Sequence, residues 1–338
     1  MNQVDDKQVQ VGIIGAGEIT KLVHLPVLMN IGDVHVEWIA DMNSQRARDL
    51  GRAFGVERHI ALNGDIQLPS CDIALLATPV YARRPYLEYF SAHGTAILAE
   101  KPFAVSSQEH QQFLEICGTN KIYCGYMRRT YATVRALRRI VREHWFGRMR
   151  SIRYSEGGRV SRTTAASKTL DMSYERGGGV LRDLGCHGLD AMLYITGASR
   201  FDLRSAAIEW DKDTDREVVS EFTLSGINHS SDECPVDFSV SWLSEQSNRM
   251  VFEFDHAVLR AGIRPEAEPE IASSARQSTW TRVHPDIVGA RSSYQAFFLE
   301  WQDVVSAFKS GRPGDLSAES ALLTTRLVDE IYQMGKGG

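Results

Sequence analysis

The sequence predicts a two-domain α/β protein, in which a doubly wound parallel sheet is followed by an α+β domain with a large, mostly antiparallel sheet. Over residues 1–125, short apolar runs alternate with helical patterns, as in parallel strands covered on both faces. From residue 126 this alternation stops. A chain of 338 residues is also long enough for two hydrophobic cores. We therefore expect one domain over residues 1–125 and a second over residues 126–338.

In the first domain, each expected strand is a short run of mainly apolar residues. We expect these strands at residues 9–15, 34–41, 73–77, 96–99 and 122–126. Helical patterns fill the intervals, and the expected helices end at residue 28 and cover residues 45–54, 83–92 and 107–117. Ser44 precedes the second of these helices and is expected to be its N-cap.

The second domain begins with helical patterns and continues as strands. Helices are expected at residues 132–145 and 180–195, with a strand at 149–155 and a polar loop up to residue 176 between them. Residues 201–259 are expected to form antiparallel strands. Two helices close the chain, at residues 294–308 and 318–334, and the last of them could pack back on the first domain.

Composition favours a cytoplasmic globular protein. The net charge of −5 is mild, which argues against nucleic-acid or membrane-surface binding. No apolar run approaches the roughly 20 residues that span a bilayer, and the first ten residues are unlike a secretory signal. The five cysteines lack C-x-x-C spacing and are expected to be reduced thiols. One helix carries a basic stripe, which we interpret as its solvated side: Arg135, Arg138, Arg139 and Arg142.

A glycine turn separates the first strand from its helix. Gly15 permits a tight turn, and Gly17 lets the backbone approach a pyrophosphate at the helix N-terminus. Thr20 departs from the pattern, because Gly or Ala is usual there. Asp41 ends the second strand, where an acid can accept hydrogen bonds from an adenosine ribose. The segment therefore predicts a dinucleotide-binding site.

Asp41 also bears on the choice of cofactor. Its carboxylate would repel a 2′-phosphate, so NAD is expected, with NADP possible. Arg46 lies close enough in sequence to stack on adenine or to reach a phosphate instead.

Two further segments carry candidate chemistry. Lys101 follows the strand at residues 96–99, and ligands bind at the carboxyl ends of such strands. Asp183 and His187 follow three glycines and stand four residues apart on a helix, so the carboxylate can orient the imidazole. Such a pair suits a general base near neutral pH. Cys186 is interpreted as packing, and no metal site is expected, because no second histidine or cysteine stands at ligand spacing.

Taken in order, four motifs resemble the Gfo/Idh/MocA family of oxidoreductases. They are the glycine turn, Thr78-Pro79 after a strand, Glu100-Lys101-Pro102, and the glycine-rich segment with Asp183 and His187. The match covers nearly the whole chain, including Arg129 after the last strand of the first domain.

The resemblance implies a Rossmann domain that binds NAD(P), and a second domain whose sheet mediates homodimers or homotetramers. It implies that Lys101, Asp183 and His187 line the reaction site, and that Arg129 joins the latter two in contacting substrate. The implied cofactor-binding residues are Gly15, Gly17, Glu18, Ile19, Asp41, Arg46, Thr78, Pro79, Glu100 and Lys101.

In the chemistry that the resemblance implies, His187 takes the hydroxyl proton while hydride leaves for the nicotinamide. Asp183 orients the ring, and Lys101 polarises the substrate oxygen, although the lysine could itself carry the proton.

The chain departs from the family in two places. Family members commonly carry a histidine a few residues after Thr78-Pro79, where this chain has Arg83. The stretch between Phe54 and Cys71 is also short, so the helix that usually covers it is expected to be missing.

Three functions are therefore compatible with the residues. The first is a dehydrogenase or reductase that acts on a secondary alcohol or ketone of a sugar or cyclitol. The second is a ketoreductase for a nucleotide-linked sugar. The third is a dinucleotide-binding regulator without chemistry, against which the intact Lys101, Asp183 and His187 argue.

Overall fold

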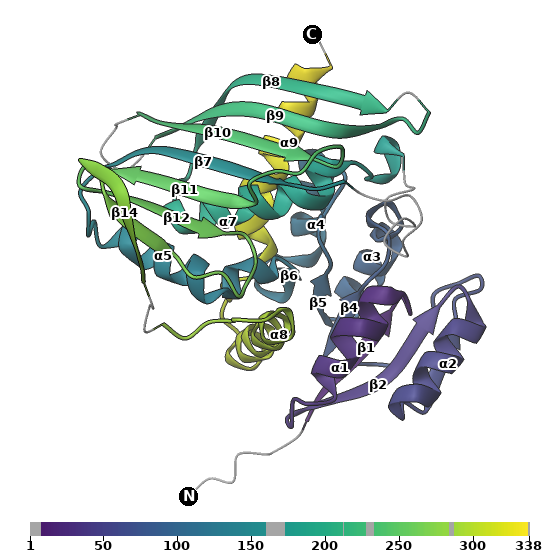
Figure 1. The fold of residues 1–338 in the computed structure, drawn as a ribbon. Helices are drawn as coiled ribbons and strands as arrows, with labels where there is room; N and C mark the ends of the chain where they lie inside the picture. Colours follow the sequence, from purple (N-terminus) through teal and green to yellow (C-terminus); the bar gives the residue numbers. More distant parts are fainter. Residues whose placement is uncertain (1–7, 160–172, 212, 228–232, 284–286, 337–338) are drawn as a thin grey trace, which may run out of the picture. The chain divides into compact units, whose positions relative to one another are not determined.

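The computed structural model describes residues 8–159, 173–211, 213–227, 233–283 and 287–336. The chain forms two compact units that are interleaved in sequence (Figure 1). Unit 1 contains residues 1–104, 108–127 and 297–321. Unit 2 contains residues 105–107, 128–296 and 322–338.

Unit 1 is built on a six-stranded parallel sheet in the order β3-β2-β1-β4-β5-β6. Its strands are β1 Val9–Ile14, β2 Val34–Asp41, β3 Arg58–Ala61, β4 Ile73–Leu76, β5 Ala96–Ala99 and β6 Ile122–Cys124. The residues of β4, β5 and β6 are all buried, which explains why they are continuously apolar. The predicted doubly wound parallel sheet is confirmed.

Helical segments connect these strands. The longer ones are α2 Ser44–Phe54, α3 Arg84–Ala92 and α4 Ser107–Cys117, and α8 Ser293–Ser310 enters unit 1 at residue 297. The shorter ones are η1 Thr20–His24, α1 Leu25–Leu28, η2 Val80–Ala82, η3 Thr119–Lys121 and η7 Ala318–Ala321. Between Phe54 and Cys71, where the covering helix was expected to be missing, the described chain has no helix.

Unit 2 contains an eight-stranded sheet in the order β14-β13-β12-β11-β7-β10-β9-β8. Its strands are β7 Met149–Gly157, β8 Phe201–Asp211, β9 Arg216–Ile227, β10 Glu233–Ser241, β11 Arg249–Phe254, β12 Ala257–Gly262, β13 Glu270–Ser273 and β14 Arg276–Arg282. All neighbours pair antiparallel except β7 and β10, which are parallel. The predicted large, mostly antiparallel sheet is confirmed.

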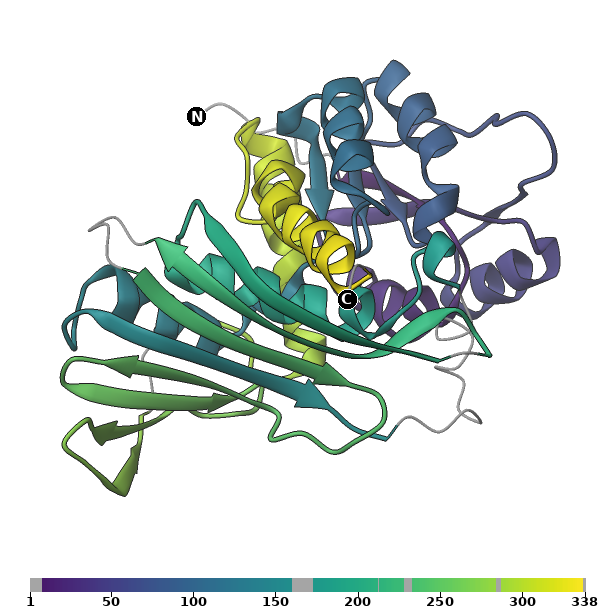
Figure 2. The ribbon, with the colours of Figure 1, turned by 90° about the horizontal axis from the view of Figure 1, so that it is seen from above.

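The helices of unit 2 gather on one face of this sheet (Figure 2). They are α5 Ala132–Arg142, α7 Cys186–Thr196 and α9 Leu322–Gly335, with shorter turns at η4 Met127–Thr130, η5 Tyr174–Arg176 and η6 Leu181–Gly185. In α7, a Cβ at Gly188 would lie 2.4 Å from the Tyr154 ring and 2.7 Å from the Phe238 ring. The glycine therefore lets the helix that carries His187 approach the sheet closely.

Several predicted details are wrong. Asn43, and not Ser44, caps α2, because its side chain accepts a hydrogen bond from the Arg46 amide. Helix α5 ends at Arg142 instead of residue 145, and His144 takes a left-handed backbone conformation just beyond it. Strands β3, β13 and β14 were not expected from the sequence.

The arginines of α5 fit the expected solvated face only in part, because Arg139 and Arg142 are exposed but Arg135 and Arg138 are half-buried. Arg138 lies 3.8 Å from the Tyr194 ring centre, and Arg139 pairs with Glu143 at 3.0 Å. In the part of the chain that the structure describes, no helix is long and apolar enough to cross a membrane.

Candidate active site

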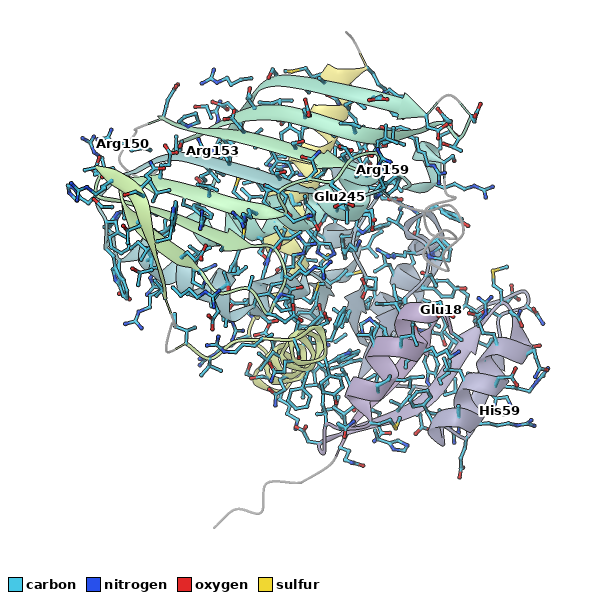
Figure 3. The ribbon with its side chains drawn as sticks, viewed as in Figure 1. Glu18, His59, Arg150, Arg153, Arg159 and Glu245 are labelled. Atoms are coloured by element: carbon cyan, nitrogen blue, oxygen red, sulfur yellow. The ribbon has the colours of Figure 1, made fainter. Side chains whose placement is uncertain are left out.

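The glycine turn of unit 1 leaves room for a ligand at its second glycine. Gly15 has a φ of 104°, and a Cβ there would lie 2.6 Å from the carbonyl oxygen of Ala77. A side chain is therefore excluded at this position. At Gly17, a Cβ would meet no atom of the described chain within 4 Å. The backbone at Gly17 is thus open to an approaching group, and the neighbouring Glu18 is exposed (Figure 3).

Thr20, the departure from the glycine pattern, fastens the turn. Its buried hydroxyl donates a hydrogen bond of 2.6 Å to the carbonyl oxygen of Gly15. The helix then begins with a π-helical turn, Thr20–His24. Where a glycine would let the helix pack closely on the strand, Thr20 instead holds the turn by a hydrogen bond.

Asp41 ties the glycine turn to the end of β2. Its Oδ2 accepts a hydrogen bond from the Ala16 amide, and its Oδ1 accepts one from the Asn43 amide, each at 2.7 Å. Because a carboxylate oxygen has more than one acceptor site, both oxygens can still accept from a ribose diol. The half-buried Asp41 therefore fits a dinucleotide. Arg46 is exposed on the first turn of α2.

His24 holds the acid that precedes Lys101. The Trp301 indole N–H donates to His24 Nδ1 at 3.0 Å, and His24 Nε2 lies 2.8 Å from Glu100 Oε1. An indole can only donate, so Nδ1 is the acceptor and the neutral ring carries its proton on Nε2. His24 therefore donates to Glu100. The other oxygen, Oε2, accepts from the Lys101 amide at 3.1 Å.

This arrangement keeps Glu100 ionised. Burial alone would raise the pKa of Glu100, but the His24 hydrogen bond and the charges of Lys101 and Arg83 lower it overall. The carboxylate thus fixes the backbone of Lys101, and the peptide bond from Lys101 to Pro102 is cis.

Arg83 joins the two loops at the carboxyl ends of β4 and β5. It is buried, and its guanidinium donates to the carbonyl oxygen of Thr78 from Nε at 3.2 Å and from Nη2 at 3.0 Å. Nη1 donates to the carbonyl oxygens of Glu100, Pro102 and, at 3.3 Å, Phe103. Burial lowers the pKa of Arg83 to about 10, so it stays charged at neutral pH. The arginine therefore clamps the loop before Pro79 to the loop of Lys101.

In unit 2, Asp183 and His187 lie at the start of one continuous helical segment. Asp183 is half-buried in the π-helical turn η6, and its amide donates to the Gly179 carbonyl oxygen at 3.0 Å. His187 follows in α7 and is 6% exposed. Single π-helical turns occur often at functional sites.

A polar cavity of about 520 Å³ opens beside this turn, within unit 2. Leu184, which follows Asp183 in the chain, lines the cavity. The other lining residues are mainly polar: Arg128, Tyr131, Glu156, Gly157, Gly158, Glu245, Asn248, Ile263, Arg264, Pro265, Glu266 and Ser293.

Two buried charges of opposite sign line this cavity. Arg128 donates to both oxygens of Glu156, from Nη1 at 2.8 Å and from Nη2 at 2.7 Å. Nη1 also donates to the Tyr154 hydroxyl at 2.9 Å, and that hydroxyl donates to Glu156. Burial and the nearby Glu156 raise the pKa of Tyr154 well above its usual value, so the phenol keeps its proton. Arg128, Tyr154 and Glu156 thus form one buried hydrogen-bond network at the cavity wall.

Arg129, expected to contact substrate, has a different partner. It is 4% exposed, and its Nε and Nη2 donate to the two oxygens of Asp190 at 2.8 and 2.5 Å. Asp190 is itself fully buried. This geometry commits Arg129 to the interior of unit 2, and the neighbouring Arg128 lines the cavity instead.

The predicted site residues thus fall into two groups. Unit 1 holds Gly15, Gly17, Glu18, Ile19, Asp41, Arg46, Thr78, Pro79, Glu100 and Lys101, and unit 2 holds Arg129, Asp183 and His187. In the described residues, no three His, Cys, Asp or Glu side chains come together to hold a metal ion.

The sequence analysis did not single out His24, Arg128 or Glu156. Glu156 could have been noticed in the sequence, because it continues the alternating, inward-facing positions of Ile152 and Tyr154 on β7. A charge in that register is unusual, since inward-facing positions are normally apolar. His24 offered no comparable signal, because its two partners are distant in sequence.

Family comparisons agree with this architecture. Residues 9–126 match the family described as "Oxidoreductase family, NAD-binding Rossmann fold", and residues 134–259 match the GFO/IDH/MocA C-terminal domain. A protein of Amycolatopsis mediterranei, named as the oxidoreductase subunit of a UDP-kanosamine synthase, is 26% identical over 81% of this chain and 82% of its own length. The rhizopine catabolism protein MocA of Rhizobium meliloti is 24% identical over 58% of this chain and 60% of its own length.

Solved structures share the fold over nearly the full chain. An aldose–aldose oxidoreductase from Caulobacter crescentus, complexed with glycerol, has a TM-score of 0.82 at 16% identity and covers 98% of each chain. KijD10, a 3-ketoreductase from Actinomadura kijaniata in complex with NADP and TDP-benzene, has a TM-score of 0.80 at 18% identity, covering 97% of this chain and 98% of its own. The glycine turn and Asp41 at the end of β2 fit a dinucleotide, and both family domains match in order. The chain therefore belongs to the GFO/IDH/MocA family of NAD(P)-dependent oxidoreductases.

Proposed function

We propose that this oxidoreductase transfers hydride between the nicotinamide and a secondary alcohol or ketone of a sugar or cyclitol. The observation that carries the proposal is the polar cavity beside the turn of Asp183, lined by the buried pair of Arg128 and Glu156. A ring with several hydroxyl groups both donates and accepts hydrogen bonds, which suits a cavity lined by fixed donors and acceptors. An apolar alcohol would displace water from this polar lining without replacing the hydrogen bonds of that water.

In the oxidation direction, the proton and the hydride leave the alcohol separately. When bound, the nicotinamide supplies the hydride acceptor at C4. His187 takes the hydroxyl proton, so the carbon–oxygen double bond forms as the carbon–hydrogen bond breaks. Asp183 orients the imidazole and the substrate hydroxyl. Lys101 polarises the substrate oxygen and stabilises the developing alkoxide, with the alternative that the lysine itself carries the proton.

We further propose that NAD is preferred to NADP. Asp41 already accepts hydrogen bonds from two backbone amides, so it is anchored where a ribose diol would lie. A phosphate at that place would meet this fixed negative charge. Arg46 is exposed and could offset the repulsion only by leaving its solvated position.

A nucleotide-linked sugar is the second candidate substrate. The names of two relatives favour it, the UDP-kanosamine synthase subunit and the dTDP-sugar 3-reductase of Streptomyces antibioticus. The cavity lining argues against it, since Glu156, Glu245 and Glu266 outnumber Arg128 and Arg264. This negative balance would repel a diphosphate. We therefore place the free sugar or cyclitol first.

The proposal is tested by a turnover screen of cyclitols, free sugars and nucleotide-linked sugars with NAD and NADP, read by nicotinamide absorbance. We expect turnover of an uncharged polyhydroxylated ring. His187→Ala and Lys101→Ala should each lower kcat by roughly 10²–10⁴-fold, the usual cost of losing a general acid or base, with little change in NAD affinity. NAD binding without any turnover would instead support the regulator.

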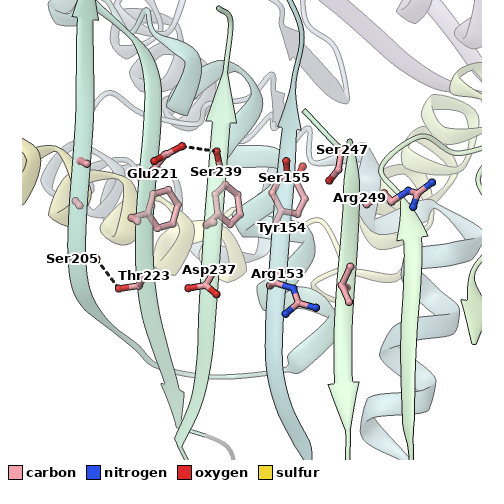
Figure 4. A pocket seen from close by; sticks show the side chains of 15 residues that line it. Arg153, Tyr154, Ser155, Ser205, Glu221, Thr223, Asp237, Ser239, Ser247 and Arg249 are labelled. Atoms are coloured by element: carbon pink, nitrogen blue, oxygen red, sulfur yellow. Dashed lines mark hydrogen bonds between the residues drawn. The ribbon is translucent and has the colours of Figure 1, made fainter. Parts of the chain in front are cut away.

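We also propose that the protein is a cytoplasmic homodimer or homotetramer that pairs through the open face of the eight-stranded sheet. Figure 4 shows this face, which is lined by polar residues of both signs, including Arg153, Glu221, Asp237 and Arg249. A face with both charges can complement itself across a two-fold axis. All five cysteines are free thiols, which supports a reducing compartment.

A further inference from the structure

Glu217 is a buried carboxyl group that the proposed chemistry does not use. It lies on β9 and is 0% exposed. Its Oε1 accepts hydrogen bonds from the Leu181 backbone amide at 3.0 Å and from the Tyr332 hydroxyl at 2.5 Å. Leu181 is the first residue of the π-helical turn that contains Asp183. A strand residue and a residue of α9 are therefore joined to the start of the helical segment that carries Asp183 and His187.

The carboxyl group of Glu217 also occupies the space of a missing side chain. Gly179 has a φ of 117°, and a Cβ there would lie 1.9–2.1 Å from the carboxyl atoms of Glu217. Only glycine allows this approach. The carbonyl oxygen of Gly179 in turn accepts the hydrogen bond from the Asp183 amide. A short chain of contacts thus leads from Glu217 through Gly179 to the backbone of Asp183.

Arg182 and Tyr332 lie next to this carboxyl group, and the Tyr174 ring packs edge-on against the Tyr332 ring with 4.8 Å between the ring centres. The Arg182 guanidinium lies 4.7 Å from the Tyr332 ring centre and 4.5 Å from that of Tyr174, whose carbonyl oxygen it binds at 2.6 Å. The Lys336 ammonium group also lies over the Tyr174 ring, 3.7 Å from its centre. These contacts hold η5, η6 and α9 together around Glu217.

Burial raises the pKa of Glu217 to about 7, although its hydrogen bonds from Tyr332 and the backbone, and the charge of Arg182, lower it in part. Burial and Glu217 raise the pKa of Tyr332 well above its usual value, so the phenol stays a donor. Oε1 can accept both hydrogen bonds whether the carboxyl group is ionised or neutral.

We propose that Glu217 is a positioning residue that holds Gly179 and Leu181 in place, so that the helical segment presents Asp183 and His187 in a fixed orientation. This proposal rests on the proposed function only in that Asp183 and His187 are taken to act on the substrate. The contacts that support the segment are independent of any substrate.

Hydrogen exchange of the intact protein tests the proposal without a substrate. Glu217→Ala removes the acceptor, and we expect the Leu181 and Asp183 amides to exchange roughly tenfold faster or more, relative to amides of β12 in the same unit. Glu217→Gln keeps an acceptor oxygen in the same shape and should keep most of the protection. The matched control is Glu221→Gln on the same strand, where the side chain is exposed.

Kinetics supply the second measurement once a substrate is known. Glu217→Ala should lower kcat about tenfold or more while the dissociation constant of NAD stays unchanged, and Glu217→Gln should restore most of kcat. Unchanged exchange at Leu181 in Glu217→Ala, or exchange that rises equally in β12, would overturn the positioning role. If exchange changes as expected but the unmodified protein oxidises no alcohol, the proposed function fails and the positioning role stands.

Discussion

Buried charged side chains with backbone partners determine much of the local structure around the candidate site. Arg83 binds carbonyl oxygens of two loops, and Glu217 binds the amide at the start of a helical segment. Each side chain substitutes for regular secondary structure, because it satisfies backbone groups that lie outside a helix or sheet ladder. Such residues are expected to be sensitive to substitution, which gives three tests at this scale.

Replacing Arg83 by Met should destabilise the protein strongly. The carbonyl oxygens of Thr78 and Glu100 would lose their buried donors, at a cost of about 1–3 kcal/mol for each unsatisfied group. We expect the free energy of unfolding to fall by roughly 3 kcal/mol, measured by urea denaturation. Arg84→Met is the control, since the neighbouring arginine is half-exposed and should cost about 0.5 kcal/mol or less. Equal effects of the two variants would contradict the clamp.

Glu217 should make stability depend on pH. Its folded pKa of about 7 lies above the ordinary glutamate pKa of 4.5, so the folded protein holds a proton that the unfolded chain releases. The stabilisation by this proton is complete below about pH 4.5 and is lost as the pH rises through 7. Relative to Glu217→Gln, the protein should lose on the order of 3 kcal/mol between these limits, measured by urea denaturation at each pH. A constant difference across this range would contradict the shifted pKa.

Asp41 should determine the choice of cofactor. In calorimetry, we expect NAD to bind more tightly than NADP, and Asp41→Ser should shrink or reverse the preference because the carboxylate no longer repels a 2′-phosphate. Asp49→Ser, further along α2, is the control. A clear NADP preference in the unmodified protein would point to Arg46 as a phosphate partner.

At the scale of helices and strands, the sequence predicts strongly patterned segments well and weakly patterned ones poorly. Strands β4 and β5 are continuously apolar because both faces are buried, and their positions were expected. Strand β14 has mostly exposed residues and β3 has no buried residue, so neither carries the pattern that reveals a strand. Long-range pairing determines such segments, and it is not visible locally.

The close packing of α7 on the sheet gives a test at this scale. Gly188→Ala would place a methyl group 2.4 Å from the Tyr154 ring, so the helix must move away from the sheet. Overpacking of this kind costs about 1–3 kcal/mol, and we expect a corresponding fall in the free energy of unfolding. Because His187 is the preceding residue, kcat should also fall. Gly197→Ala is the comparison, because a Cβ at Gly197 meets no atom within 4 Å in the described chain. Any loss of stability in that variant comes from the left-handed backbone at Gly197 and not from a clash. A stable, fully active Gly188→Ala variant would contradict this packing.

For the whole molecule, the sequence predicts the motifs of the site better than their supporting contacts. The glycine turn, Lys101 and the pair of Asp183 and His187 each have a local pattern. Lys101's neighbour Glu100 is bound by His24, and His24 is in turn bound by Trp301. No local pattern indicates such contacts, because folding alone brings these residues together.

The assembly proposed above can be tested in solution. Analytical ultracentrifugation should show a dimer or tetramer. Ser239→Arg places a long charged side chain on the open face of the sheet, beside Glu221, and should produce monomers with an unchanged fold by circular dichroism. Gln111→Arg, exposed on α4, is the control. A monomeric unmodified protein would refute the assembly.

The interleaving of the two units limits how this chain can be recombined. Its path changes unit after residues 104, 107, 127, 296 and 321. A chimera that exchanges only residues 1–127 with a relative would separate His24 from the Trp301 that fixes its tautomer. A cofactor module that can be transplanted must therefore contain residues 297–321 as well. Among relatives, substitutions at residues 24 and 301 are expected to be correlated, although 276 residues lie between the two positions in the sequence.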